Sequence, residues 1–201
     1  MKRILHLKSS LLGSDSHSIR LGNAIVDQIV QKYPDSTCEE LDLIESEIPH
    51  LTPVALHSMF SPAENLPEEQ SAISSLSDIL VAQLLQADII VMGAPLINFT
   101  IPSQLKAWID HVTRPGKTFS YGADGRPAGL VVNKKIYIAM ASGGVYSEGP
   151  GKANDFVVPY LQAFLGFLGM TDISVFRAEG LKVPGIKEHA MEKAIGSIVI
   201  D

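Results

Sequence analysis

Four small polar side chains follow the first apolar run of the chain and could together hold a phosphate group. The run Ile4-Leu5-His6-Leu7 has the length of a buried strand, and a hydroxyl-rich segment comes directly after it. The donors in that segment are Ser10, Ser16, His17 and Ser18. A helix pattern begins next, so its free backbone N–H groups and positive dipole end would face the same ligand. The spacing predicts a site for a phosphate monoester.

Other phosphate-binding loops fit this segment poorly. A dinucleotide fingerprint needs three glycines at fixed spacing, and only Gly13 is present. The phosphate loop of nucleotide hydrolases needs Gly-Lys-Ser/Thr at the helix start, and that sequence is absent. The alternative for Ser16 or Ser18 is a purely structural role as the N-cap of the following helix.

Two later loops could hold a flat, hydrogen-bonding ring. The first, Pro95-Leu96-Ile97-Asn98-Phe99, combines an amide with apolar neighbours that could lie along a ring face. The second, Ser142-Gly143-Gly144, would let backbone N–H groups approach a ligand closely. Taken singly, Asn98 and the glycine pair could equally be ordinary turn residues. Taken with the phosphate loop, they describe a ligand of the shape of FMN.

Composition and charge narrow the class of protein. The 201 residues are enough for one well-buried domain, and 46% hydrophobic with 19% charged residues is typical of a globular chain. We expect one domain over residues 1–201. The net charge of −6 disfavours a nucleic-acid partner. The six histidines are scattered, which predicts no metal site.

The single cysteine and the N-terminus bear on location. One cysteine, Cys38, cannot form a disulfide within the chain, so a reducing compartment is expected. The apolar run near the N-terminus has only four residues, which is too short for a signal peptide or a membrane span. We therefore expect a cytoplasmic protein without a membrane partner.

Strand and helix patterns alternate along the chain. We expect strands at 3–8, 37–43, 89–94, 134–141 and 173–176, the last with room to extend to Ala178. We expect helices at 19–33, 68–86, 102–112, 157–168 and 185–199, a short helix at 54–60 within the irregular segment 44–67, and a loop or small hairpin at 118–130. His6 and Trp108 are expected in the core, Trp108 alternatively at an interface.

This alternation predicts a parallel sheet with helices on both faces. The best match is a flavodoxin-like three-layer α/β sandwich with a five-stranded parallel sheet in the order 2-1-3-4-5. Ligands in such a fold bind beyond the carboxyl ends of the strands, at the point where the strand order reverses. The three polar loops would converge there.

The chain resembles the FMN-dependent NADH-azoreductase family, part of the flavodoxin-like NAD(P)H:quinone oxidoreductases. The matching segments run nearly end to end: Leu7–Ser10, Ser16–Ser18, Ala94–Phe99, Gln104–Lys106, Gly143-Gly144, Gly149-Pro150, Pro159–Leu161, Phe164–Gly169 and Ala178–Gly180. The resemblance implies a homodimer with one non-covalent FMN per protomer near the interface. It also implies ping-pong exchange, in which NADH or NADPH reduces the flavin and a quinone or aromatic azo compound then takes two electrons.

The resemblance also implies roles for individual residues. Ser10, Ser16, His17 and Ser18 would hold the FMN phosphate and ribityl chain. Pro95, Leu96, Ile97, Asn98 and Phe99 would border the isoalloxazine ring, and Ser142, Gly143 and Gly144 would meet its pyrimidine edge. Phe119, Tyr121, Phe164 and Phe167 would line the substrate cavity across the dimer. Tyr146 is a further substrate-site candidate, as proton donor or charge stabiliser, with a packing role as the alternative. No side chain is needed as a catalytic acid or base, because the flavin carries the chemistry.

Two loops depart from the family pattern. Many relatives have Met-Tyr-Asn-Phe where this chain has Leu96-Ile97-Asn98-Phe99, and Ser-Arg-Gly-Gly where it has Ala141-Ser142-Gly143-Gly144. A hydroxyl and a cation are thus missing from their usual positions, which affects nicotinamide preference and acceptor range. Two alternatives share the fold: a flavodoxin-type electron-transfer protein and a non-enzymatic FMN-binding module.

Overall fold

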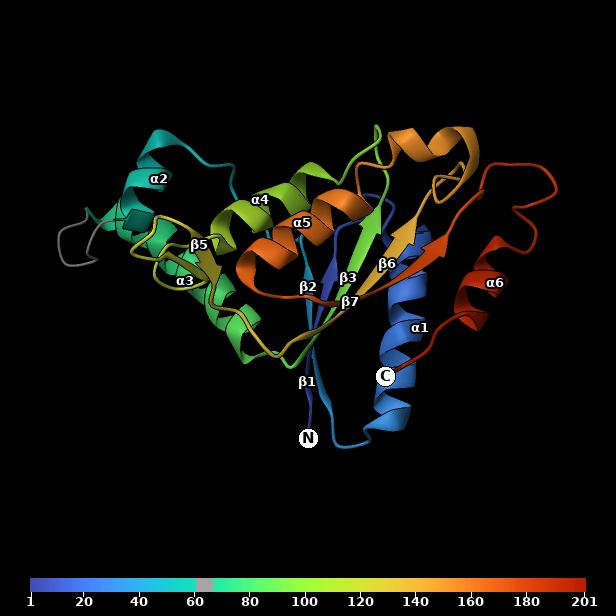
Figure 1. The fold of residues 1–201 in the computed structure, drawn as a ribbon, viewed down its shortest axis with the longest axis horizontal. Helices are drawn as coiled ribbons and strands as arrows, with labels where there is room; N and C mark the ends of the chain where they lie inside the picture. Colours follow the sequence, from blue (N-terminus) through green and yellow to red (C-terminus); the bar gives the residue numbers. More distant parts are fainter. Residues whose placement is uncertain (61–66) are drawn as a thin grey trace.

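The computed structural model, which describes residues 1–60 and 67–201, is built on one five-stranded parallel sheet (Figure 1). Its strands are β1 (Arg3–Lys8), β2 (Thr37–Asp42), β3 (Ile89–Pro95), β6 (Lys135–Ala141) and β7 (Asp172–Ala178). They lie in the order β2-β1-β3-β6-β7, and every neighbouring pair is parallel. The predicted order 2-1-3-4-5 is therefore confirmed, with β6 and β7 as the fourth and fifth strands. Residues 61–66 of the predicted irregular segment lie outside the described residues.

Burial along the strands explains this order. Strands β3 and β6 are buried along almost their whole length, because helices cover both faces of the sheet centre. Alternate residues of β3 enter two separate cores, Ile89 and Val91 on one face and Ile90 and Met92 on the other. Strand β2 is mostly exposed and lies at the edge, as its alternating sequence predicts.

Five helices form the two outer layers. On one face of the sheet lie α1 (His17–Lys32) and α6 (Ala190–Gly196), and on the other lie α3 (Glu68–Gln86), α4 (Ser103–Val112) and α5 (Val158–Leu168) (Figure 1). The short predicted helix is confirmed as α2 (Pro53–Phe60), which packs against α3. Trp108 of α4 is fully buried in the core, as expected. No helix among the described residues combines the length and apolar character needed to cross a membrane.

The segment predicted as a loop or hairpin forms the hairpin β4 (Phe119–Tyr121) and β5 (Pro127–Gly129). It packs on the end of α5 so closely that a Cβ at Gly129 would lie 2.1 Å from the backbone nitrogen of Gly169. Only glycine permits this approach.

The last predicted helix is wrong in extent. A helix was expected over 185–199, but α6 covers only Ala190–Gly196. Residues 180–189 instead form a series of tight turns, in which Val183, Ile186 and His189 each donate to the carbonyl three residues earlier. Gly185 has φ +82°, a conformation that ends regular helix, and Pro184 has no N–H to donate. Two 3-10 helices, η1 (Gly13–Asp15) and η3 (Gly149–Asn154), were not predicted.

His6 is buried inside the sheet, as expected, without a hydrogen-bond partner for either ring nitrogen. A Cβ at Gly22 of α1 would lie 2.6 Å from its Nε2, so the imidazole fills the space that this glycine leaves. Burial, with a smaller contribution from the Lys8 cation, lowers the pKa of His6 to about 4 against the opposing effect of Glu40. The imidazole is therefore neutral in the folded protein near neutral pH.

This burial predicts a pH-dependent loss of stability. The folded-state pKa lies below the unfolded value of 6.5, so unfolding takes up a proton as pH falls from 6.5 to 4. Linkage predicts a loss of about 3 kcal/mol of unfolding free energy across that window. We expect His6→Leu to remove most of this slope in urea denaturation at several pH values. His189→Leu, at an exposed histidine, is the control and should keep it. An unchanged slope in His6→Leu would contradict the prediction.

Candidate functional site

A cavity of about 750 Å³ lies beyond the carboxyl ends of β1, β3 and β6, where the three polar loops meet. This volume is in the range of sites that bury a drug-sized ligand. Its lining comprises Ser10, Leu11, Leu12, Ser16, His17, Ser18, Pro95, Leu96, Ile97, Ala141, Ser142, Gly143, Gly144, Tyr146, Leu181, Lys182 and Val183. Most of the cofactor-site residues named from the sequence are thus brought to one place.

The loop after β1 presents buried hydroxyl groups at the start of α1. Ser9 fixes the loop, since its Oγ donates to the carbonyl of Gly93 on β3 at 2.6 Å. Ser16 Oγ accepts from the N–H of Ile19 at 3.3 Å, so Ser16 is the N-cap of α1 as well as a lining residue. Ser16 Oγ and Ser18 Oγ lie 3.1 Å apart and are both buried. The helix therefore begins at His17, two residues before its predicted start.

The electrostatics of the cavity suit an anionic ligand. None of its lining residues is an aspartate or glutamate, although the whole chain carries a net charge of −6. Lys182, from the loop after β7, is the lysine in the lining. A phosphate at the start of α1 would meet hydroxyl donors and the positive helix end without a facing carboxylate.

The loop after β3 turns back within two residues. Ile97 and Thr100 exchange both backbone hydrogen bonds, at 2.9 and 3.0 Å, and Asn98 and Phe99 between them have φ of +49° and +70°. Such a conformation is common for asparagine and rare for phenylalanine. Asn98 thus has the turn role that was the alternative for it. It lines a smaller cavity of about 520 Å³ that shares Leu11 and Ile97 with the larger one.

The loop after β6 forms a wall of bare backbone. Gly143 lies against the stem of Lys182, with the position of an added Cβ only 3.2 Å from its Cδ. A Cβ at Gly144 would lie 3.2 Å from Cε2 of Tyr146. The carbonyl of Gly144 accepts from Ser142 Oγ at 2.8 Å and from the N–H of Gly180 at 2.9 Å, which holds the loop against the segment after β7.

The aromatic residues expected in a substrate site lie elsewhere, apart from Tyr146. Phe119, Tyr121 and Phe167 form a cluster at the hairpin, with ring centroids 5.5 Å apart for Phe119–Tyr121 and 4.8 Å for Phe119–Phe167. Phe164, a residue of α5, is buried in the core. None of these four lines the larger cavity of this chain. Tyr146 lines that cavity, and its ring meets Phe99 edge-on at 6.4 Å.

Several lining residues were not named from the sequence. They are Leu11 and Leu12 beside the phosphate loop, and Leu181, Lys182 and Val183 after β7. The segment Ala178–Gly180, which matches the family pattern, directly precedes Leu181, Lys182 and Val183. It was the sequence feature from which these lining residues could have been predicted. Lys182 brings a cation to the loop where the family arginine is missing.

The residues of the cavity fit FMN at both ends. Two buried hydroxyls at a helix start suit its phosphate, and exposed backbone beside apolar Pro95, Leu96 and Ile97 suits its ring. The model of the flavodoxin-like fold matches residues 2–199 of this chain. The chain belongs to the flavodoxin-like fold family. The predicted fold class is thereby confirmed. The predicted resemblance to the FMN-dependent NADH-azoreductases is confirmed by relatives that are 33 to 45% identical to this chain.

Relatives within this family are close in sequence and length. An FMN-dependent NADH:quinone oxidoreductase of Herminiimonas arsenicoxydans is 45% identical over 181 residues, which cover 90% of this chain and 88% of that protein. One of Agrobacterium fabrum (strain C58 / ATCC 33970) is 42% identical over 197 residues, 98% and 94% of the two chains. The crystal structure of an azoreductase from Bacillus anthracis str. Sterne superposes with a TM-score of 0.91 at 33% identity, covering 98% of this flavodoxin-like chain and 96% of the other.

Proposed function

We propose that this protein is an FMN-dependent NADH:quinone oxidoreductase that also reduces aromatic azo compounds. The observation that carries the proposal is the cavity, which joins buried serine hydroxyls at a helix start to a wall of glycine backbone. The names of the relatives support it, since those proteins are oxidoreductases of this kind. FMN, when bound, supplies hydride acceptance and two-electron donation.

The residues of the chain bind and orient the cofactor. Ser10, Ser16, His17 and Ser18 hold the phosphate and ribityl chain through hydroxyls, backbone N–H groups and the positive end of α1. Pro95, Leu96 and Ile97 supply an apolar wall for the ring face. Ser142, Gly143 and Gly144 direct backbone toward the pyrimidine edge, where negative charge develops on reduction. Lys182, beside Gly143, adds a positive charge at this end.

Asn98, Phe99 and Tyr146 border the entrance to the ring. The turn at Asn98 and Phe99 exposes about half of the Phe99 side chain, which contacts the Tyr146 ring. In this proposal Phe99 borders the isoalloxazine and an incoming acceptor stacks near it. In this proposal the Tyr146 hydroxyl, from a residue that lines the cavity, donates a hydrogen bond to that acceptor.

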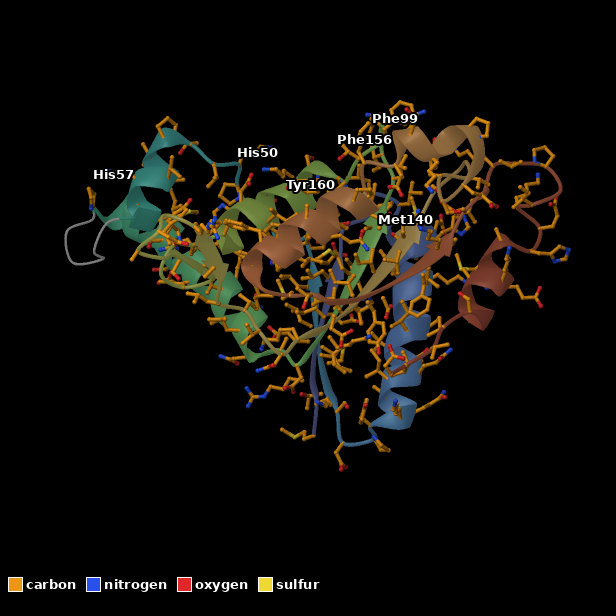
Figure 2. All side chains as sticks on the ribbon, in the orientation of Figure 1. His50, His57, Phe99, Met140, Phe156 and Tyr160 are labelled. Carbon is orange, nitrogen blue, oxygen red and sulfur yellow. The ribbon has the colours of Figure 1, made fainter. Side chains whose placement is uncertain are left out.

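A homodimer completes the site. Apolar side chains are exposed around the cavity mouth at Leu11, Leu12, Phe99 and Phe156, and such a gathering is typical of an interface. Figure 2 shows Phe99 and Phe156 together at the carboxyl end of the sheet. Of the four aromatic residues at the hairpin and on α5, Tyr121 and Phe167 would then be available to the cavity of the second copy, whereas Phe119 and Phe164 are buried within their own chain. The free Cys38 and the absence of a disulfide partner in the chain suit a cytoplasmic location.

Anaerobic reduction of the FMN-loaded protein tests this function. We expect NADH, or NADPH in a parallel cuvette, to bleach the oxidised flavin band fully, and a benzoquinone or an azo dye to restore it. Double-reciprocal plots of steady-state rates should be parallel, because the nicotinamide leaves before the acceptor binds. Bound flavin that neither nicotinamide bleaches would favour the binding-module alternative. Accumulation of one-electron-reduced flavin would favour an electron-transfer protein.

A further inference from the structure

A largely buried ion cluster adjoins the Tyr146 loop, and none of its residues lines the cavity. Arg177 of β7 donates from Nη2 to Asp155 Oδ2 at 2.7 Å and from Nη1 to Glu179 Oε1 at 3.2 Å. The side chains of Asp155 and Glu179 are only 6% and 10% exposed, and that of Arg177 is 21% exposed. One cation therefore pairs with two nearly buried carboxylates. This pairing lowers the free-energy cost of burying the charges.

Each carboxylate also holds a backbone segment of the site. Glu179 Oε1 accepts from the N–H of Tyr146 at 2.9 Å, in the loop after β6. Asp155 Oδ1 accepts from the N–H groups of Val157 and Val158 at 3.0 and 3.1 Å, at the start of α5. The cluster thus joins the Tyr146 loop, the strand β7 and the first turn of α5.

The same cluster reaches the loop after β3. The N–H of Phe156, next to Asp155, donates to the carbonyl of Phe99 at 3.2 Å, and the Phe99 ring meets the ring of Tyr146. Figure 2 places Phe99 and Phe156 side by side above the end of β3, with Met140 of β6 below them. Arg177 Nη1 also lies 3.9 Å from Sδ of Met140. These contacts therefore connect the Tyr146 loop to the Phe99 loop, the two segments beside the end of the cavity proposed for the flavin ring.

We propose that Arg177, Asp155 and Glu179 are positioning residues that set the shape of the ring end of the cavity. This inference rests on the proposed FMN site and adds residues that do not touch the ligand. Because Glu179 holds the backbone of Tyr146, whose ring lies beside Gly144, loss of the cluster should weaken the binding of the isoalloxazine. The phosphate end, held by Ser16 and Ser18 on α1, shares no contact with the cluster and should keep its grip.

The chain offers a matched control for this cluster. Lys135 of β6 also bridges two carboxylates, those of Asp172 and Asp201, at 2.7 and 2.8 Å. It lies at the opposite end of the same pair of strands, far along the sheet from the cavity. Lys135→Met thus removes a bridging cation of the same kind without touching the loops of the site.

Flavin titrations followed by fluorescence quenching test the proposal with Arg177→Met and Glu179→Ala. We expect both variants to lower the affinity for riboflavin, which has no phosphate, about tenfold. This factor corresponds to the free energy of about one hydrogen bond. The affinity for FMN should fall by the same factor, so the preference for FMN over riboflavin should stay constant. Lys135→Met should leave both affinities within about twofold, and Arg177→Lys should recover part of the loss.

Hydrogen exchange gives a second readout that does not depend on turnover. We expect the amide of Tyr146 to exchange about tenfold faster in FMN-bound Glu179→Ala than in the unaltered protein, because it has lost its acceptor. Glu179→Ala keeps the Arg177–Asp155 pair and remains informative if Arg177→Met fails to fold. Unchanged riboflavin affinity and unchanged Tyr146 exchange in Glu179→Ala would overturn the proposal. Failure of the unaltered protein to bind either flavin would instead overturn the proposed function.

Discussion

Replacing Ser16 and Ser18 together with alanine is expected to weaken FMN binding about a hundredfold, because in the proposed site the phosphate loses two buried hydroxyl donors. The two hydroxyls are 3.1 Å apart and are held at the start of α1. Hydrogen bonds to a charged group contribute about 1.5 to 3 kcal/mol each, and the lower value for both already gives this factor. Riboflavin lacks the phosphate, so its affinity should change little.

Titration of the variant with FMN and with riboflavin separates the two ends of the ligand. Ser16 also caps α1, so the double variant should lose about 1 kcal/mol of unfolding free energy and must be compared well below its melting temperature. Ser14→Ala is the control, since Ser14 is exposed and outside the cavity lining. An equal loss for riboflavin and FMN, or no loss for FMN, would place the phosphate elsewhere.

Replacing Gly144 with valine is expected to lower the affinities for FMN and for riboflavin alike, by about tenfold or more. An added Cβ would lie 3.2 Å from the Tyr146 ring, so a valine must displace that ring or extend into the cavity. Overpacking of this kind costs about 1 to 3 kcal/mol, which corresponds to a factor of about 5 to 150 in affinity.

The same titrations with both flavins measure this effect. We expect the absorption spectrum of any flavin still bound to shift, because the surroundings of the pyrimidine edge have changed. Gly196→Val, at the end of α6, is the control, since a Cβ there meets nothing within 4 Å. Normal affinity and an unshifted spectrum in Gly144→Val would contradict the placement of the ring edge at this loop.

The two substitutions together test the orientation of the ligand. The serine pair should alter the preference for FMN over riboflavin, and the glycine replacement should leave that preference unchanged. This contrast follows from the geometry, because α1 and the loop after β6 supply opposite ends of one cavity.

Local sequence patterns were sufficient for the fold. The continuous apolar run at 89–94 identified the central strand, and the alternating run at 37–43 identified the edge strand β2, because burial on one or two faces leaves a direct imprint on residue type. The last helix was misjudged at its start. Residues 185–189 contain one apolar side chain, Ile186, and Pro184 together with the positive φ of Gly185 produces turns there.

The candidate site was predicted only where it consists of short contiguous segments. The serine loop, Pro95–Ile97 and Ser142–Gly144 each follow a strand, and the parallel topology alone brings their ends together. Within one such segment, however, Asn98 and Phe99 form a two-residue turn and are not part of the lining of the larger cavity, although the Phe99 ring meets Tyr146, which is. That conformation requires positive φ at a phenylalanine, which sequence preferences argue against.

The sequence by itself determined the flavodoxin-like order of strands and the three loops at their carboxyl ends, and it predicted a phosphate site at the first of these loops. These features depend on residues close together in the chain, where periodicity and helix-start preferences act. Only the tertiary structure decided that Lys182 covers Gly143, that Arg177 joins Asp155 to Glu179, and that Phe119 and Tyr121 pack away from the cavity of their own chain. Those arrangements depend on side chains from distant segments meeting in space, and packing between them leaves no periodic trace in the sequence.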